Sequence, residues 1–185
     1  MPGRRRVVAW VAVAVGLVVA ALVVVFATAG TPNDTSQLLG RPAPPLSGTT
    51  LRGHRHVTLS AYAGKWLLID FAASWCVDCR EELPQLELFD RTASRYDAAV
   101  LTVEEDPADA PSMARWLAGE GARWSALQDP QASIAYGVTG IPTAFLVSPD
   151  GIVVGYYPSG ISPSSLDSLI TGATRSARAS GSSGR

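Results

Sequence analysis

The pattern of apolar residues divides the chain into an N-terminal hydrophobic stretch and a segment with mixed strand and helix signals. Residues 7–26 are uncharged and almost wholly apolar. Farther along, residues 66–71 and 98–103 form two short, nearly continuous apolar runs, which is the pattern of strands buried on both faces of a sheet. Between them, apolar residues recur at helical spacing over residues 77–94. The chain therefore predicts a hydrophobic helix followed by an α/β domain.

Shorter patterns complete the predicted domain. His56–Leu59 follows a turn at Gly53 and predicts one arm of an edge β-hairpin. The remaining predicted elements are helices over 110–119, 131–136 and 164–174, and strands over 144–147 and 152–156 joined by a tight turn. Residues 176–185 are rich in Ser, Gly and Arg, and we expect them to be disordered. The predicted fold is a central mixed β-sheet flanked by helices, with an N-terminal β-hairpin and its first two buried strands parallel.

The N-terminal stretch is long enough to cross a membrane. Twenty helical residues rise about 30 Å, the thickness of a bilayer core. Arg4–Arg6 precede the stretch, so the positive-inside rule places the N-terminus in the cytoplasm. We expect a cytoplasmic segment over 1–6, a single-pass transmembrane anchor over 7–29 and a linker over 30–38. The alternative is a signal peptide cleaved after the small-x-small sequence Ala27–Ala29, which would leave the domain secreted.

Composition and charge exclude one class of partner. The formal net charge is −1, and no run of basic residues follows the N-terminal arginines. A nucleic-acid-binding domain would carry a basic patch, so we expect no such partner. Residues 39–175 amount to one domain on the extracytoplasmic side, and that side is oxidising.

The chain has only two cysteines, Cys76 and Cys79, and they lie three positions apart. A Cys-x-x-Cys pair directly after a buried strand, at the start of a helix, is typical of a couple that cycles between dithiol and disulfide. Unpaired N–H groups at the helix N-terminus would stabilise the Cys76 thiolate, so we expect Cys76 to attack and Cys79 to resolve the mixed disulfide. Trp75 is expected to cover the pair and to give substrates an apolar surface. A purely structural pair of thiols, or a permanent disulfide, is the alternative.

Three carboxyls near the pair are candidates for a role in its chemistry. Asp70 lies in the apolar strand, where burial would raise its pKa and make it a proton carrier. Glu82 lies three residues after Cys79 and so shares a helix face with it. For both, the alternative is a carboxyl that merely reaches solvent. Asp78, between the cysteines, is expected to raise the pKa of Cys76 and to make the couple more reducing.

Two further features bear on the site. Ile141–Pro142 precedes a predicted strand and is a candidate cis peptide, whose backbone could pair with a substrate peptide beside Cys76. The alternative is a simple turn. A zinc site needs four ligands, and the chain adds only His54 and His56 to its two thiols. We therefore expect no metal and place both histidines on the surface.

Together these features resemble the TlpA/ResA-like branch of the thioredoxin superfamily, membrane-anchored thiol–disulfide oxidoreductases related to the AhpC/TSA family. The resemblance covers about residues 39–169, through the segments Gly40–Pro44, Leu59–Lys65, Trp66–Glu82, Leu127–Pro130 and Tyr136–Thr143. It implies a thioredoxin-like fold, with Cys76 as nucleophile, Cys79 as resolving thiol and Pro142 as cis-proline. It also implies that Glu82 is an active-site glutamate and that Asp70 is the buried aspartate of thioredoxin. Asp78 departs from the branch, in which proline is common, and so do the two residues before Trp75.

The resemblance also implies a function. Members of the branch reduce protein disulfides outside the membrane, and apocytochrome c is one of their substrates. Their electrons come from a transmembrane thiol donor, and no cofactor is implied. Three alternatives stay open: a thiol peroxidase of the peroxiredoxin type, an oxidase of exported proteins, and a non-enzymatic, membrane-tethered binding module. The sequence argues against the thiol peroxidase, because Ala73 occupies the position three residues before the reactive cysteine where peroxiredoxins have Thr.

Overall fold

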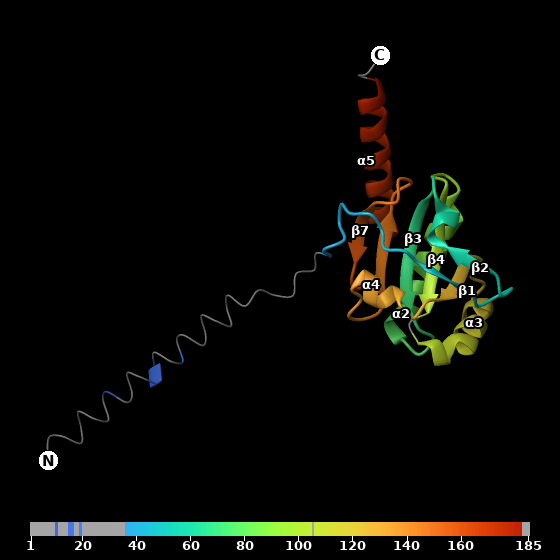
Figure 1. Ribbon diagram of the computed structural model, residues 1–185, viewed down its shortest axis with the longest axis vertical. Helices are drawn as coiled ribbons and strands as arrows, with labels where there is room; N and C mark the ends of the chain where they lie inside the picture. Colours follow the sequence, from blue (N-terminus) through green and yellow to red (C-terminus); the bar gives the residue numbers. More distant parts are fainter. Residues whose placement is uncertain (1–9, 11–14, 17–18, 20–35, 105, 183–185) are drawn as a thin grey trace. The chain divides into compact units, whose positions relative to one another are not determined.

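The computed structural model describes residues 10, 15–16, 19, 36–104 and 106–182 (Figure 1). The chain divides into two units, Met1–Asp34 and Thr35–Arg185. The predicted basic segment, most of the predicted anchor and most of the linker lie outside the described residues. Within the predicted anchor, Trp10, Val15, Gly16 and Val19 are helical. Among the residues that the structure describes, no helix has the length and apolar character needed to span a membrane.

The second unit is built on a single mixed sheet of seven strands, in the order β2-β1-β5-β4-β3-β6-β7 (Figure 1). The strands are β1 (Ser47–Thr50), β2 (His56–Thr58), β3 (Trp66–Ala72), β4 (Ala98–Glu104), β5 (Ser125–Gln128), β6 (Thr143–Val147) and β7 (Val153–Tyr157). The two apolar runs form the centre, with β3 and β4 parallel, as predicted. β6 pairs antiparallel with β3, and β1 and β2 form the predicted N-terminal hairpin.

Helices cover both faces of the sheet. They are η1 (Leu59–Tyr62), α2 (Val77–Ala93), η2 (Pro107–Asp109), α3 (Ala110–Gly119), α4 (Ala132–Tyr136) and α5 (Pro163–Ser182). Side chains of α2, α3 and α5 join one core cluster, and those of α4 join the other. The domain is therefore a three-layer α/β/α sandwich.

Alternation along β3 assigns its side chains to the two cores. Trp66, Leu68 and Ala72 belong to the cluster under α2, whereas Leu67, Ile69 and Phe71 belong to the cluster on the α4 face. Successive side chains of a strand point to opposite faces, so Asp70 shares the face of Leu68 and Ala72. The only charged residue of β3 therefore lies on the face that carries the cysteine helix.

Helix α2 packs on this face through the stripe that its sequence predicts. Leu83, Leu86 and Phe89 are buried, whereas the flanking Leu88 is 43% exposed. Burying a side chain of this size contributes about 1.5–3 kcal/mol. The stripe thus fixes the rotation of α2, and with it the direction in which its first turn presents the cysteines.

The structure corrects the prediction in three places. β5 was not predicted, because only Ala126 and Leu127 of its four residues are buried and its ladder depends on β4 and β1 on either side. The second hairpin strand ends at Thr58, and Leu59 begins a 3₁₀ turn. Helix α5 continues to Ser182, into the segment predicted to be disordered; Ala and Arg favour helix, and no proline interrupts it. Residues 183–185 lie outside the described part.

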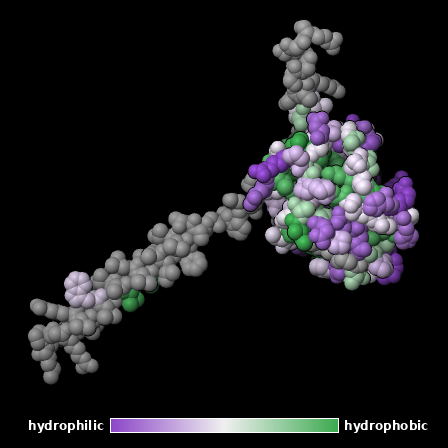
Figure 2. Space-filling model, in the orientation of Figure 1, coloured by the Kyte–Doolittle hydropathy of each residue, from purple (hydrophilic) through white to green (hydrophobic). Residues whose placement is uncertain are grey.

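The surface seen in Figure 2 mixes hydrophilic and hydrophobic residues. Large exposed apolar side chains of the second unit are few and spread along the sequence: Leu39, Trp75, Val77, Leu88, Ile134 and Leu169. Two of them, Trp75 and Val77, are the immediate neighbours of Cys76. Exposed apolar side chains therefore flank Cys76 in the segment that follows β3.

Candidate active site at the cysteine pair

The sheet register brings the cysteine loop and the proline loop to the same edge. β3 ends at Ala72, and in the antiparallel pairing Phe71 stands opposite Thr143, the first residue of β6. Pro142 therefore lies beside the end of β3, from which the chain continues into the cysteine loop. The Ile141–Pro142 peptide is cis, as predicted. The carboxyl ends of the central parallel strands are where open α/β sheets place their sites.

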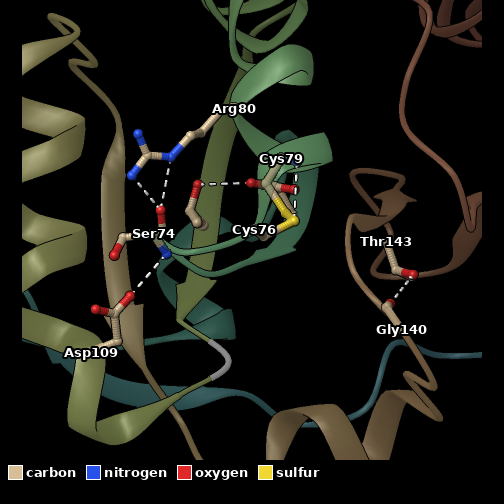
Figure 3. Close-up of a disulfide and its surroundings, with 9 residues drawn as sticks. Ser74, Cys76, Cys79, Arg80, Asp109, Gly140 and Thr143 are labelled. Carbon is tan, nitrogen blue, oxygen red and sulfur yellow. Dashed lines mark hydrogen bonds between the residues drawn. A yellow bond between two sulfur atoms is a disulfide. The ribbon is translucent and has the colours of Figure 1, made fainter.

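The two cysteines are joined by a disulfide at the start of α2 (Figure 3). Cys76 is the N-cap residue, and its Sγ accepts a hydrogen bond from the backbone N–H of Cys79 at 3.1 Å. The exposed fraction is 6% for Cys76 and 2% for Cys79. An N–H donor aimed at Sγ, together with the positive end of the helix dipole, favours negative charge on the Cys76 sulfur. Cys76 therefore lies at the N-terminus of the helix and Cys79 is the more buried of the two, which are the positions that the sequence predicts.

The surface around Cys76 is apolar. Trp75 is 60% exposed and Val77 is 66% exposed. Trp75 is open to solvent and offers the apolar surface that the sequence predicts. Val77 was not predicted, although the residue directly after a helix N-cap often faces outward. Both side chains are available to an incoming chain.

The peptide group of Ser74 is held from two sides (Figure 3). Arg80 donates from Nε and Nη2 to the Ser74 carbonyl, at 2.9 and 2.7 Å, and Asp109 Oδ2 accepts from the Ser74 N–H at 2.9 Å. The Arg80 guanidinium also lies 5.6 Å from the centre of the Trp116 ring, a cation–π contact. We call Arg80 and Asp109 the Ser74 clamp. Sequence reasoning missed it, because its three parts come from a loop, α2 and η2.

Asp70 is buried beneath the cysteine pair's helix, as the sequence predicts. It is 1% exposed, and its Oδ2 accepts a hydrogen bond from Thr102 Oγ1 at 3.1 Å, while Trp124 Nε1 donates to the same hydroxyl at 2.9 Å. Its Oδ1 is buried and has no hydrogen-bond partner among the described residues. Burial, reinforced by the nearby Glu82 carboxyl, raises the pKa of Asp70 well above its ordinary value, and the Thr102 bond only partly opposes this.

Glu82 is the second buried carboxyl of the predicted pair. It is 7% exposed, and its Oε1 accepts a hydrogen bond from the Ile161 N–H at 2.7 Å. Burial raises the pKa of Glu82, and the Ile161 bond lowers it in part. Oε2 has no hydrogen-bond partner in the described part of the chain. The electrostatic interaction with Asp70 places both acids in one local network on the α2 side of the sheet.

A third buried acid, Glu104, was missed by sequence reasoning. It ends β4 opposite Ala72, is 1% exposed and accepts a hydrogen bond from the Asp106 N–H through Oε1 at 2.9 Å. A signal was available, because a carboxyl at the end of the second parallel strand must reach the same sheet edge as the cysteine loop.

A groove of about 460 Å³ opens between the start of α2 and the proline loop. One side is lined by Asp78, Glu81, Glu82 and Gln85 of α2, and the other by Ile141, Pro142 and residues 158–161. The structure thus brings the predicted Ile141, Pro142 and Glu82 together with Asp78. Asp78 is exposed, in the first turn of α2. We call this space the acidic groove.

The histidines lie apart from this site. His54 and His56 are exposed, with His56 in β2 of the hairpin. Within the described residues, no group of three or more His, Cys, Asp or Glu side chains is arranged to hold a metal ion. The groups that the structure gathers at the site are two sulfurs, nearby backbone N–H groups and buried carboxyls.

Residues 39–156 match the model of the AhpC/TSA family. The chain belongs to this family. The thiol-disulfide oxidoreductase ResA of Geobacillus kaustophilus is 28% identical over 123 residues, which cover 65% of this chain and 70% of that protein. The thiol:disulfide interchange protein DsbE of Xylella fastidiosa is 30% identical over 139 residues, 73% and 68% of the two chains.

Structural similarity agrees with this membership of the AhpC/TSA family. The crystal structure of a protein described as a thiol:disulfide interchange protein DsbE, from Chlorobium tepidum, matches with a TM-score of 0.64 and 28% identity, over 73% of this chain and 96% of that one. The predicted thioredoxin-like fold is confirmed. This AhpC/TSA-family chain is a ResA-like thiol–disulfide oxidoreductase of the thioredoxin superfamily. Cys76 and Cys79 are the only cysteines in its sequence.

Proposed function

We propose that this chain reduces protein disulfides on the extracytoplasmic side of the cell membrane, with Cys76 as nucleophile and Cys79 as resolving thiol. The observation that carries the proposal is the site geometry. Cys76 caps α2 with an N–H donor on its sulfur, exposed Trp75 is its neighbour in the chain, and the less exposed Cys79 lies three residues before the buried Glu82 in α2. The names of the ResA, CycY and DsbE relatives support disulfide exchange with protein substrates.

The reaction transfers two electrons to the substrate. The Cys76 thiolate attacks one sulfur of a substrate disulfide, and the other substrate sulfur leaves as a thiolate. The Cys79 thiolate then attacks Cys76 Sγ, forms the Cys76–Cys79 disulfide and releases the second substrate sulfur. The disulfide seen in Figure 3 is the oxidised product of this cycle.

The buried acids handle the proton of Cys79. Cys79 must lose its proton before it resolves the mixed disulfide, and it is nearly inaccessible to bulk water. Asp70 and Glu82 both have raised pKa values, which brings their proton affinity closer to that of a thiol. Each carboxylate accepts this proton directly or through water, and later returns it to solvent through the acidic groove that Glu82 lines.

Substrates bind along the proline loop. The backbone of Ile141 and Pro142, at the start of β6, pairs with an extended substrate segment, while Trp75 supplies apolar contact. The resemblance to the TlpA/ResA-like branch favours apocytochrome c as one substrate. The same resemblance assigns the recharging of the dithiol to a transmembrane thiol donor.

The direction of the reaction follows from Asp78. Asp78 lies between the two cysteines in sequence and is exposed; its negative charge opposes a thiolate on Cys76, so it favours the disulfide over the dithiol and makes the couple a reductant. Equilibration of the purified protein with glutathione measures this. We expect a potential near that of thioredoxin, about −270 mV, and less reducing in Asp78→Asn. A reduction potential of about −120 mV, typical of a strong oxidase, would favour the oxidase alternative instead.

The proposed location depends on the residues before the domain. In this proposal residues 7–29 anchor the protein with its N-terminus in the cytoplasm; in the alternative, cleavage of a signal peptide releases the domain. This part of the proposal rests on the length of the apolar stretch and on Arg4–Arg6.

A trapping experiment in the native membrane tests the function. In Cys79→Ala the mixed disulfide on Cys76 cannot be resolved, so we expect substrate proteins to accumulate on it and to be released by reductant. The double variant that also carries Cys76→Ala is the control and should trap none. Recovery of c-type apocytochromes would support that substrate, and a broad set of secreted proteins would indicate general reduction. A trap that stays empty would favour a non-enzymatic binding module.

A peroxidase assay separates the remaining alternative. Ala73, three residues before Cys76, is fully buried and offers no hydroxyl to a peroxide. We expect no peroxide consumption by the purified protein. Consumption that needs Cys76 but not Cys79 would instead support a thiol peroxidase.

A further inference from the structure

The acidic groove carries negative charge directly beside the disulfide. Asp78 and Glu81 are exposed on the first turns of α2, and Glu82 lies deeper, between them and Ile161. The facing wall is the cis-proline loop. A substrate chain that crosses Cys76 and pairs with this loop must therefore pass over the three carboxyls.

The described residues that line the groove include no basic side chain, so none of them balances the charge of these carboxyls. Arg80 is the basic residue nearest in sequence, but both of its hydrogen bonds go to Ser74 and its guanidinium lies over Trp116. Figure 3 shows Arg80 on one side of the cysteines and Gly140 and Thr143 on the other. The two flanks of the disulfide therefore differ in charge.

A second observation indicates that the groove is built to receive a donor. Glu82 is more than nine-tenths buried, yet only Oε1 is hydrogen-bonded, to the Ile161 N–H, and Oε2 has no partner among the described residues. A buried carboxylate oxygen without a donor is costly, and a ligand N–H or ammonium group would satisfy it. Positive φ at Gly160 keeps this wall free of a side chain, and a Cβ there would lie 3.6 Å from Glu82 Oε1.

We propose that the acidic groove selects disulfides flanked by a lysine or arginine, which lies against Asp78, Glu81 and Glu82 while Cys76 attacks. This selectivity rests on the proposed reductase function and names the class of substrate that the same site prefers. Because Asp78 and Glu81 are exposed, the effect is of the size of a surface charge pair and is screened by salt. We expect a preference of about tenfold at low ionic strength for cationic over anionic flanks.

Symmetrical peptide dimers test the preference. Each dimer joins two copies of a five-residue peptide, Ala-Xaa-Cys-Xaa-Ala with blocked ends, where Xaa is Lys, Gln or Glu; symmetry makes attack on either sulfur equivalent. The pre-reduced protein reacts in a single turnover, and the released peptide thiol is quantified. Each rate is divided by the rate of the same dimer with dithiothreitol, which removes the effect of the flanking charges on the disulfide itself.

Two variants in the groove, one control variant outside it and a change of ionic strength locate the effect. Glu81→Gln alone should reduce the preference, and Asp78→Asn with Glu81→Gln should remove most of it. Glu120→Gln, at the end of α3, removes one exposed charge outside the groove and should keep the preference. Raising the ionic strength from about 0.01 M to about 1 M shortens the Debye length from about 30 Å to about 3 Å and should abolish it.

The outcomes separate the two proposals. Reduction of all three dimers at equal normalised rates, or faster reduction of the Glu dimer, overturns the selectivity and leaves the reductase intact. A preference that survives in the double variant also overturns it, since the groove would not be its source. If none of the dimers is reduced, the proposed function itself fails.

Discussion

Asp70 is a single residue whose burial is unfavourable for stability and is explained by the proposed proton transfer. A carboxyl that is 1% exposed, with one oxygen lacking a partner among the described residues, does little for the packing of β3. Its presence makes sense if a proton must be moved near Cys79.

We predict that Asp70→Asn stabilises the oxidised protein at neutral and alkaline pH. The folded-state pKa of Asp70 lies above the ordinary value of 3.8, so the folded state binds more protons than the unfolded state between these two values. The free energy of unfolding therefore falls as pH rises from about 4 through the folded pKa. Each pKa unit between the two states is worth about 1.4 kcal/mol.

Thermal or urea unfolding from pH 4 to pH 9 measures this difference. The variant should match the parent near pH 4 and exceed it increasingly at higher pH. Asp150→Asn, an exposed turn residue, controls for the loss of one charge. If the free energy of unfolding depends on pH in the same way for Asp70→Asn and the parent across the whole range, ionised Asp70 does not destabilise the folded protein.

The second prediction concerns the Ser74 clamp. Arg80→Lys keeps the positive charge but cannot reproduce the two-pronged contact with the Ser74 carbonyl. We expect a loss of about tenfold in the rate of disulfide reduction, because the loop that carries Cys76 is held less firmly. Asp109→Ala should have a similar effect through the Ser74 N–H.

Two controls distinguish positioning from a general loss of structure. Arg91→Lys lies at the exposed end of the same helix and should leave the rate unchanged. The pH at which the Cys76 thiolate forms, followed by its absorbance in the reduced protein, should shift in Asp109→Ala. An unchanged thiolate titration together with an unchanged rate would remove the clamp from the mechanism.

A helix or strand could be predicted where its own residues carry a clear apolar pattern. Strands β3 and β4 were predictable because both of their faces are buried, which requires unbroken apolar runs. Helix α2 was predictable from its apolar stripe. Strand β5 was not, since its four residues adopt the extended form through ladders with β4 and β1.

The candidate site divides in the same way. The cysteines, Pro142 and Glu82 belong to short motifs, and Asp70 stands out as a charge in an apolar run, so sequence reasoning found them. The roles of Arg80 and Asp109 depend on contacts between segments 6 to 35 residues apart, which no local pattern marks. Glu104 was missed although it follows a predicted strand, because its place at the site depends on the register between β3 and β4.

A prediction at this scale concerns the stripe that orients α2. Leu86→Ala removes a side chain that is 3% exposed and should lower the free energy of unfolding by about 2–5 kcal/mol. Leu88→Ala, on the same helix, removes a side chain of equal size that is 43% exposed, and should cost far less. Urea unfolding of the oxidised proteins compares them. Equal losses would mean that α2 does not pack as the structure shows.

For the whole molecule, the proposed reducing direction and the proposed extracytoplasmic location depend on each other. A dithiol outside the cytoplasm is oxidised by its surroundings, so a reductase there needs a donor that delivers electrons across the membrane. An anchor over 7–29 would keep the domain within reach of such a donor, whereas a secreted domain would act once and remain oxidised. The proposed direction of the reaction therefore favours the anchor over the cleaved signal peptide.

Thiol labelling in intact cells tests this link. In Cys79→Ala, Cys76 is the only cysteine of the chain, so a membrane-impermeant maleimide should modify the protein in unbroken cells after mild reduction. The labelled protein should sediment with membranes and keep its full length. A second variant, Ser176→Cys in helix α5 with Cys76→Ala and Cys79→Ala, should label equally if the C-terminal end is also outside. Labelling only after lysis would place the domain in the cytoplasm, and labelled protein in the medium would show that the signal peptide is cleaved.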